Sequence, residues 1–282
     1  MDGQKINWFP GHMAKAMRKT EEDAKLCDGV IYVLDARAPY ACINDKLLKI
    51  VGNKPIIYAL NKADLVEKRS ADKVCSEFSV GGKIIRSLSG LNKKEVENLK
   101  SACLIALKEK RLKDEAKGIK RTYRFMVIGI PNTGKSTIIN TLAGGKKAET
   151  GDKAGVTRAN KWIRIGGFDL LDTPGTMPPS MDNQTYAKHL AYIGCINDEI
   201  LDLEGLTVGL IADLRELCPD ALAERFNLKT LDNEPIDLFN EICGSRGYVL
   251  KGNEYDYARG ARAFISDFRK GKIAKVCLEE RP

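Results

Sequence analysis

Apolar residues follow two different periods along the chain, and the change of period divides the chain near residue 178. Through the first 175 residues, short apolar runs rich in β-branched residues alternate with stretches of helical period. This alternation predicts a mostly parallel sheet with helices on both faces. We expect buried strands at 28–36, 54–62, 83–89 and 123–130, and a hairpin formed by 162–166 and 168–174.

A long amphipathic helix is predicted between the third strand and the fourth, over residues 92–117. Its apolar positions, 96, 99, 103, 104 and 107, recur at helical spacing. The segment then becomes lysine-rich, and residues 108–124 hold eight Lys and Arg against three acidic residues. Such a charge run fits either a solvated surface or a contact with nucleic acid, and the sequence leaves both interpretations open.

The pattern becomes wholly helical after PGTMPPS (174–180), where Pro178 and Pro179 mark a boundary. We therefore predict two domains, an α/β domain over 1–178 and a small all-α domain over 179–282. Helices are expected at 183–196, 207–218, 221–227, 236–247 and 255–272.

Composition narrows the class of protein. Hydrophobic residues make up 43% and charged residues 30% of the 282 positions, which is typical of a globular protein. No apolar run approaches the roughly 20 residues that cross a bilayer, and the N-terminal sequence lacks the pattern of a secretory signal. We therefore expect a cytoplasmic protein with no membrane partner. The eight cysteines form no CxxC pair, so core thiols are expected in place of disulfides or a metal site.

Charge is spread unevenly along the chain. Residues 1–179 carry 33 Lys and Arg against 20 Asp and Glu, whereas residues 180–282 carry 13 against 18. The excess of positive charge suggests a polyanionic partner such as RNA, although solvated lysines that only aid solubility give the same balance.

A phosphate-binding loop is predicted at 129–136, where GIPNTGKS lies between an expected strand and an expected helix. Its glycines let successive backbone N–H groups point at a phosphate, and the helix N-terminus adds a favourable dipole. Lys135 should reach the β- and γ-phosphates, and the Ser136 hydroxyl should coordinate Mg²⁺. The loop alone leaves ATP and GTP open. Its other expected contacts come from Asn132, Thr133, Gly134 and Thr137.

A guanine-reading segment is predicted at Asn61-Lys62-Ala-Asp64, directly after a buried strand. Side chains there emerge at the carboxyl end of the strand, where α/β sheets bind ligands. Asp64 can accept from the N1 and N2 groups of guanine, a pair of donors that adenine lacks. We expect Asn61 to pin neighbouring loops and the stem of Lys62 to lie over the base. The pattern is short and also occurs by chance, so it needs support.

Three further segments supply that support. Asp172 can hold Mg²⁺, directly or through water, and the N–H of Gly175 in the same DTPG segment can face the γ-phosphate. Thr157 is a candidate switch threonine whose hydroxyl closes on Mg²⁺. Ser87 and Leu88 can contact the guanine oxygen through their backbone. Together these segments predict a site for GTP or GDP with Mg²⁺.

The guanine-reading segment precedes the phosphate-binding loop, which reverses the order of an ordinary small GTPase. A parallel sheet depends on which strands lie side by side, and natural termini often lie close enough to permit permutation. The sequence therefore predicts a circularly permuted P-loop GTPase domain. The DTPG segment then leads directly into the helical domain, so that hydrolysis could reorient that domain.

The order NKAD, SLS, GIPNTGKS, GVT and DTPG, together with NWFPGHMAKA near the N-terminus, resembles the circularly permuted GTPases of ribosome assembly, in particular the bacterial ribosome biogenesis GTPase A family. The resemblance covers essentially the whole chain. It implies a low-turnover enzyme that hydrolyses GTP to GDP and phosphate, acts late in assembly of the large (50S) ribosomal subunit and is stimulated by it. Thr133 and the Arg86-SLS segment depart from the usual family residues, and the helical domain is net acidic.

The residue that orients the attacking water is less evident. Ras-like proteins place a glutamine after the DxxG glycine, but here Thr176 holds that position and is too short. His12 is the candidate. A lone histidine is often only structural, yet the resemblance implies a role for this one in hydrolysis. Asn132 is a candidate K⁺ ligand, with a loop-shaping hydrogen bond as the alternative.

Two basic segments are candidates for contacts with rRNA or ribosomal proteins: Lys15, Arg18 and Lys19 in the first helix, and Arg259, Arg262, Arg269, Lys270 and Lys272 in the last.

Two other functions compete with this reading. A P-loop nucleotide kinase would share the phosphate-binding loop but would not need NKAD, and it would need an arginine-rich lid that the sequence does not suggest. A GTP-dependent ribosome- or RNA-binding module with negligible hydrolysis would fit every nucleotide motif if His12 is not catalytic.

Overall fold

The computed structural model describes residues 11–144, 162–177 and 182–279. Thr157 and the expected domain boundary at Pro178 and Pro179 lie outside these residues. Across the described ranges, no helix combines the length and the apolar character that a membrane span requires.

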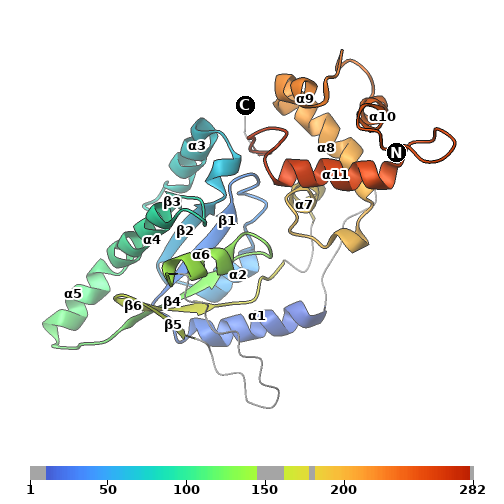
Figure 1. Cartoon of the computed structure of the whole chain (residues 1–282). Coiled ribbons are helices and arrows are strands. Elements are labelled where there is room, and N and C mark those ends of the chain that lie inside the picture. Colours follow the sequence, from blue (N-terminus) through green and yellow to red (C-terminus); the bar gives the residue numbers. More distant parts are fainter. Residues whose placement is uncertain (1–10, 145–161, 178–181, 280–282) are drawn as a thin grey trace.

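Six strands form one sheet in the order β3-β2-β1-β4-β6-β5 (Figure 1). All neighbouring pairs run parallel except β5 and β6, which form the predicted hairpin. The predicted α/β fold class is therefore confirmed. The strands are β1 (Gly29–Asp35), β2 (Ile56–Asn61), β3 (Ile84–Ser87), β4 (Tyr123–Ile128), β5 (Trp162–Ile165) and β6 (Phe168–Asp172).

The strand β1 lies near the middle of the sheet and is buried along its whole length, as its apolar run on both faces demands. It pairs with β2 on one side and with β4, far away in sequence, on the other. The register places Asp35 opposite Asn61 and Leu60 opposite Ser87. Because these strands are parallel, their carboxyl ends meet at one edge of the sheet, and that edge carries the predicted site.

Helices cover both faces of the sheet. One face packs against α4 (Lys93–Ala106) and α6 (Lys135–Leu142). The other packs against α1 (Gly11–Ala24), α2 (Asp45–Val51) and α3 (Lys68–Phe78), and the short η1 (Ala63–Leu65) follows β2.

The prediction of one continuous helix over 92–117 is wrong. The segment forms two helices, α4 and α5 (Lys108–Ala116), which are separated at Leu107 with φ −101° and ψ 10°. Leu107 is buried, whereas α5 buries no residue and extends past the sheet (Figure 1). The break falls where packing ends, since most helical stability in proteins comes from an apolar face that packs against a core.

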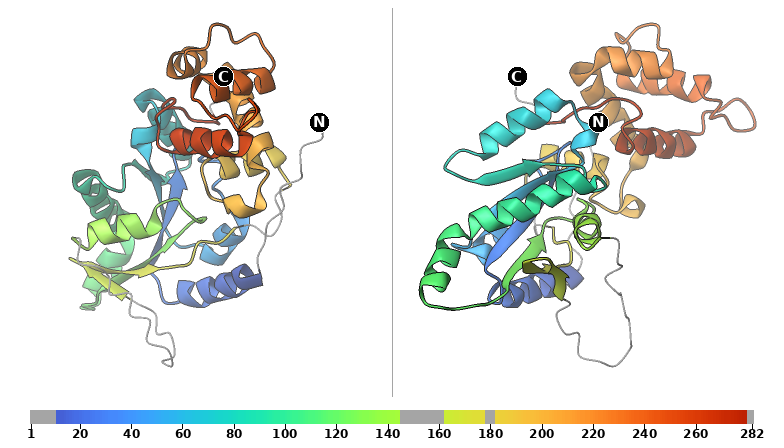
Figure 2. Two further views of the ribbon diagram at one scale, coloured as in Figure 1. Left: turned by 45° about the vertical axis from the view of Figure 1, so that its right-hand side comes forward. Right: turned by 60° about the vertical axis from the view of Figure 1, so that its left-hand side comes forward.

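The predicted C-terminal helices are confirmed, and they lie together beside the sheet (Figure 2). Their buried side chains continue the core of one sheet face. The segment after α11 returns to the sheet, where the N–H of Leu278 donates to the carbonyl of Arg37 at 2.7 Å. The elements are α7 (Gln184–Tyr192), η2 (Asp198–Ile200), α8 (Leu203–Leu217), α9 (Pro219–Phe226), α10 (Pro235–Ser245) and α11 (Tyr257–Arg269).

Candidate nucleotide site

The loop between β4 and α6 has the backbone that a phosphate-binding loop needs. Asn132 and Gly134 both have positive φ, at 60° and 94°, which asparagine tolerates and glycine favours. A Cβ at Gly134 would run into the side-chain amide of Asn61. The loop ends at the N-terminus of α6, whose unpaired N–H groups favour an anion.

Lys135 is buried, and its Nζ donates to the carbonyl of Ile130 at 2.8 Å. Burial lowers the pKa of Lys135 to about 8, and the nearby carboxylate of Asp172 opposes that effect only in part. The ammonium group thus donates to a neutral carbonyl of its own loop. An anion placed in the loop would offer it a stronger partner.

Ser136 and Asp172 meet at the carboxyl end of β6. The Ser136 hydroxyl donates to Oδ2 of Asp172 at 3.2 Å, and burial raises the pKa of that carboxyl group. A hydroxyl and a carboxylate side by side are hard oxygen ligands of the type that Mg²⁺ prefers. The residues present therefore fit a magnesium ion that would take its other ligands from phosphate and water.

The segment after Asp172 lies against the phosphate-binding loop. A Cβ at Gly175 would lie 2.8 Å from backbone atoms of Pro131 and 2.9 Å from Nζ of Lys135, so only glycine fits without displacement. Thr176 is 1% exposed, and its hydroxyl has no hydrogen-bond partner among the described residues. Its carbonyl accepts from Asn44 at the start of α2. The side chain of Thr176 is thus enclosed, and it is not available to orient a water molecule.

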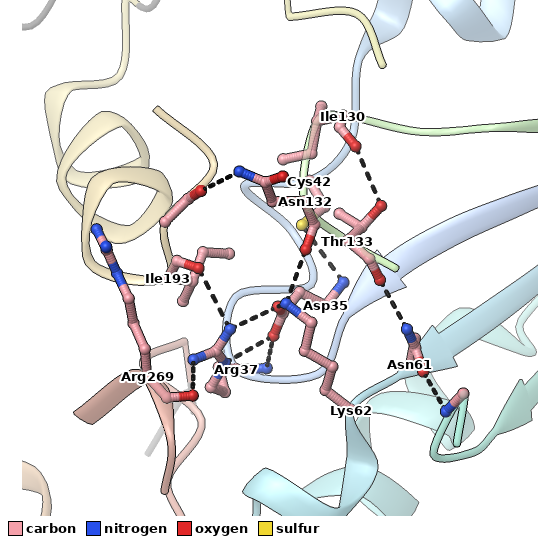
Figure 3. Close-up of polar contacts among 12 residues, drawn as sticks. Asp35, Arg37, Cys42, Asn61, Lys62, Ile130, Asn132, Thr133, Ile193 and Arg269 are labelled. Carbon is pink, nitrogen blue, oxygen red and sulfur yellow. Dashed lines mark hydrogen bonds and ion pairs between the residues drawn. The ribbon is translucent and has the colours of Figure 1, made fainter. Parts of the chain in front are cut away.

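Asn61 joins the guanine-reading segment to the phosphate-binding loop (Figure 3). Its Nδ2 donates to the carbonyl of Thr133, and its Oδ1 accepts from the N–H of Gly90, both at 2.7 Å. The two segments therefore meet at the carboxyl edge of the sheet, as a single nucleotide site would require.

The other residues predicted to contact guanine gather beside Asn61. Asp64 is exposed in η1, and Ser87 is exposed at the end of β3. Leu88 is buried, and its backbone joins the two loops: its N–H donates to Leu60, and its carbonyl accepts from Ala63. Thr137 is half-buried in the first turn of α6.

Lys62 connects three parts of the site. Its backbone is left-handed at φ 59°. Its Nζ donates to the carbonyl of Asn132 at 2.8 Å and forms an ion pair with Asp35 at 2.7 Å (Figure 3). Lys62 therefore spans from the end of β2 to both the end of β1 and the phosphate-binding loop.

Asp35 and Arg37 also belong to this network, although neither was predicted as a site residue. Asp35 is the last residue of β1, and Arg37 lies just after it. Asp35 is fully buried, and its carboxylate accepts from Nε and Nη2 of Arg37 at 2.9 and 2.8 Å. Burial alone would raise the pKa of Asp35, but the charges of Arg37 and Lys62 lower it below its usual value. The signal that could have found this pair is an acid and an arginine two residues apart at the end of an apolar strand.

The C-terminal helices reach this site through backbone carbonyls. Nδ2 of Asn132 donates to Gly194 at 2.7 Å. The guanidinium of Arg37 donates to the carbonyls of Ile193, after α7, and of Arg269, at the end of α11, at 3.4 and 3.2 Å. The hydrogen bond to Gly194 fits the loop-shaping role expected as an alternative for Asn132. The side-chain oxygen of Asn132 makes no hydrogen bond within the described residues.

The predicted catalytic residue lies at the edge of what the structure describes. His12 is in the first turn of α1, and Thr157, the expected switch threonine, lies outside the described residues. The helix α1 packs with α2 on one face of the sheet, and Asn44, which caps α2, contacts the DTPG segment through Thr176. Lys15 and Arg18 are exposed on α1.

The chain is similar to known GTPases in sequence and to a solved structure in fold. A family model described as 50S ribosome-binding GTPase matches residues 124–212. The chain is similar to "Ribosome biogenesis GTPase A" of Bacillus cereus, with 38% identity over 97% of this chain and 93% of that protein. The protein of the same name from Thermotoga maritima is 28% identical over 97% and 94%. The solved structure of GNP-bound YlqF from T. maritima has a similar fold, with a TM-score of 0.63 at 24% identity over 94% of this chain and 98% of that one.

Proposed function

Because the chain belongs to the ribosome biogenesis GTPase A family, we propose that this GTP hydrolase acts late in the assembly of the large ribosomal subunit and is stimulated by that subunit. GTP would bind across the carboxyl edge of the sheet and leave as GDP and phosphate. We assign the nucleotide-binding unit to residues 1–178 and a helical unit to residues 179–282.

The hydrogen bond from Asn61 to Thr133 is the observation that carries the nucleotide assignment. It supports a pocket in which Asp64 reads guanine while Lys135 holds the phosphates. The base side would be completed by Lys62, Ser87 and Leu88. On the phosphate side the contacts would come from Asn132, Thr133, Gly134, Ser136, Thr137 and Gly175.

Magnesium would be held by Ser136, Thr157 and Asp172, the last directly or through water. The ion supplies charge neutralisation at the β- and γ-phosphates when bound. Ser136 and Asp172 keep their oxygens together through their own hydrogen bond, so this part of the ligand set is already in place. Asn132 is a candidate K⁺ ligand through its side-chain oxygen.

Catalysis requires a group that orients water, and Thr176 is enclosed. We assign this role to His12, which α1 would carry toward the γ-phosphate. The contact of Asn44 with Thr176 supports a connection between the α1–α2 layer and the DTPG segment. Docking of the large subunit on Lys15, Arg18 and Lys19 would then order the His12 region and stimulate hydrolysis.

Phosphate contacts with rRNA would come from surfaces rich in uncompensated lysine and arginine. In α11 and the turn after it, Arg269 is paired with Asp198 at 2.7 Å and Lys272 with Asp267 at 3.8 Å. Arg259, Arg262 and Lys270 are therefore the better candidates. Near α5, a groove of about 900 Å³ is lined by five lysines (54, 83, 108, 110 and 113) and two acids (28 and 109). The charge of Asp28 is already balanced by Lys110 and Arg121. This groove lies at the amino-terminal ends of β2 and β3, away from the proposed nucleotide site.

The test is GTP turnover of the wild type and of His12→Ala, each alone and with purified large subunits, together with co-sedimentation in a non-hydrolysable GTP analogue. We expect subunit-stimulated turnover in the wild type, little in His12→Ala, and equal co-sedimentation of both. Nucleotide-dependent co-sedimentation without turnover in the wild type would indicate a binding module instead. Failure to bind large subunits in either nucleotide state would refute the assembly role.

A further inference from the structure

The buried carboxylate of Asp35 is shared by two cations with different neighbours. Lys62 contacts Oδ2 from the guanine-reading segment, and Arg37 contacts both oxygens from the loop that follows β1 (Figure 3). Asp35 is fully buried, Arg37 is almost fully buried, and the side chain of Lys62 is about one quarter exposed. The carboxylate thus lies between an enclosed cation and one that borders the nucleotide site.

On the nucleotide side, Asp35 fixes the position of Lys62. A lysine has a long flexible stem, and holding it in one geometry costs conformational entropy. Here the ion pair and the carbonyl of Asn132 hold Nζ at two points. The stem is therefore stretched across the gap between the guanine-reading segment and the phosphate-binding loop before a base arrives.

On the other side, Arg37 fixes the position of Asp35, and Arg37 is itself held by contacts with the C-terminal helices. Its guanidinium donates to the carbonyls of Ile193 and Arg269, and it lies 5.9 Å from the ring centroid of Phe268. All three partners belong to the helical region. If that region moved away, Arg37 would lose both carbonyl acceptors, and Asp35 would lose the support of its main cation.

We propose that Asp35 and Arg37 are positioning residues that couple the guanine contact of Lys62 to the seating of the C-terminal helices. Coupling between two sites is reciprocal. Guanine binding therefore stabilises the docked helices, and docked helices raise the affinity for guanine nucleotides. This inference rests on the proposed function, because it assumes that Lys62 lies over the base.

The first test is a double-mutant cycle on Asp35 and Lys62, read as the dissociation constant of fluorescent GDP. If Asp35 acts through Lys62, then Asp35→Asn and Lys62→Ala should each weaken binding by about tenfold, and the double variant should be no weaker than the poorer single variant. If the double variant instead loses affinity by the product of the two single losses, Asp35 does not act by positioning Lys62. If the wild type does not bind GDP, the proposed function fails first.

The second test follows hydrogen exchange of the 184–200 and 257–279 segments with and without GDP. We expect GDP to slow exchange there in the wild type and to lose most of this effect in Arg37→Gln. The control is Arg225→Gln, which removes an ion pair to Asp267 between two helices of the same region and should preserve the response to GDP. Equal GDP protection in Arg37→Gln and the wild type, or none in the wild type, would overturn the coupling. This measurement does not need Asp35→Asn, which leaves Arg37 buried without its carboxylate and so lowers stability.

Discussion

Asn61 and Thr133 are 72 positions apart in sequence, and the side chain of the first donates to the carbonyl of the second at 2.7 Å. The same amide group accepts from Gly90. One buried side chain thus holds together three loops that come from β2, β3 and β4. Together with Lys62, whose Nζ donates to the carbonyl of Asn132, Asn61 thus fixes the spacing between the proposed base and phosphate ends of the site.

Replacing Asn61 with alanine should therefore weaken GDP binding by about tenfold or more, because each buried partner left without its hydrogen bond costs about 1–3 kcal/mol. A titration with fluorescent GDP measures this change. Asn140→Ala is a matched control, since Asn140 is exposed on α6 and makes no side-chain hydrogen bond within the described residues. Equal affinity in the two variants would contradict the role of Asn61.

Gly175→Ala should disrupt the phosphate end of the site. The added Cβ would lie 2.8 Å from backbone atoms of Pro131, which cannot yield as a flexible side chain can. We expect GTP turnover and GDP affinity both to fall by about tenfold. Gly166→Ala, at a position where a Cβ meets nothing within 4 Å, should leave both unchanged. An active Gly175→Ala enzyme would show that the DTPG segment moves away when nucleotide binds.

Nucleotide affinity should depend on pH through Lys135. Its pKa is about 8 without ligand because burial disfavours the charged form, and phosphate oxygens would raise it by favouring the ammonium. Affinity for GDP should thus be full below about pH 8 and fall as pH rises through the free-state pKa, by up to tenfold per pH unit. Lys135→Arg keeps its charge throughout this pH range. Any change of its GDP affinity with pH therefore comes from the nucleotide and not from the side chain. Parallel curves for the two proteins would contradict the assignment.

Charge reversal in the groove near α5 should weaken binding to large subunits. Lys83, Lys108 and Lys113 make no ion pair or side-chain hydrogen bond in the part of the chain that the structure describes, so their charges are available for phosphate. The triple variant to glutamate should reduce the slope of log affinity against log salt by about 2 to 3, since each phosphate contact contributes about 0.7 to 0.9. The triple variant Lys188→Glu, Lys229→Glu and Lys251→Glu changes net charge equally on the helical region. If both variants show the same slope, the groove makes no specific contribution.

The sequence allowed the strands and the phosphate-binding loop to be predicted because their signals are local. An apolar run that ends in NKAD, or one that leads into GIPNTGKS, can be recognised from a few neighbouring residues, without reference to distant parts of the chain. The break at Leu107 escaped prediction because the helical period continues through it, and only the edge of the core decides where packing stops.

The polar network around Asp35 escaped prediction for a different reason. Apart from Asp35 and Arg37, which are two residues apart, its members become neighbours only when β1 pairs with β2 and when the C-terminal helices dock on that edge. Contacts of Arg37 with Arg269, and of Asn132 with Gly194, join positions separated by 232 and 62 residues through backbone carbonyls, which have no signature in side-chain chemistry.

The strand order also bears on how the molecule is made. Synthesis delivers β1, β2 and β3 first, and these three pair with one another in sequence order, so a growing polypeptide can assemble the proposed guanine-binding half early. The proposed phosphate-binding half needs β4 and β6, which leave the exit tunnel later. If the proposed site is correct, a nascent chain can therefore bind its nucleotide only after translation has passed the DTPG segment, when most of the chain has already been synthesised.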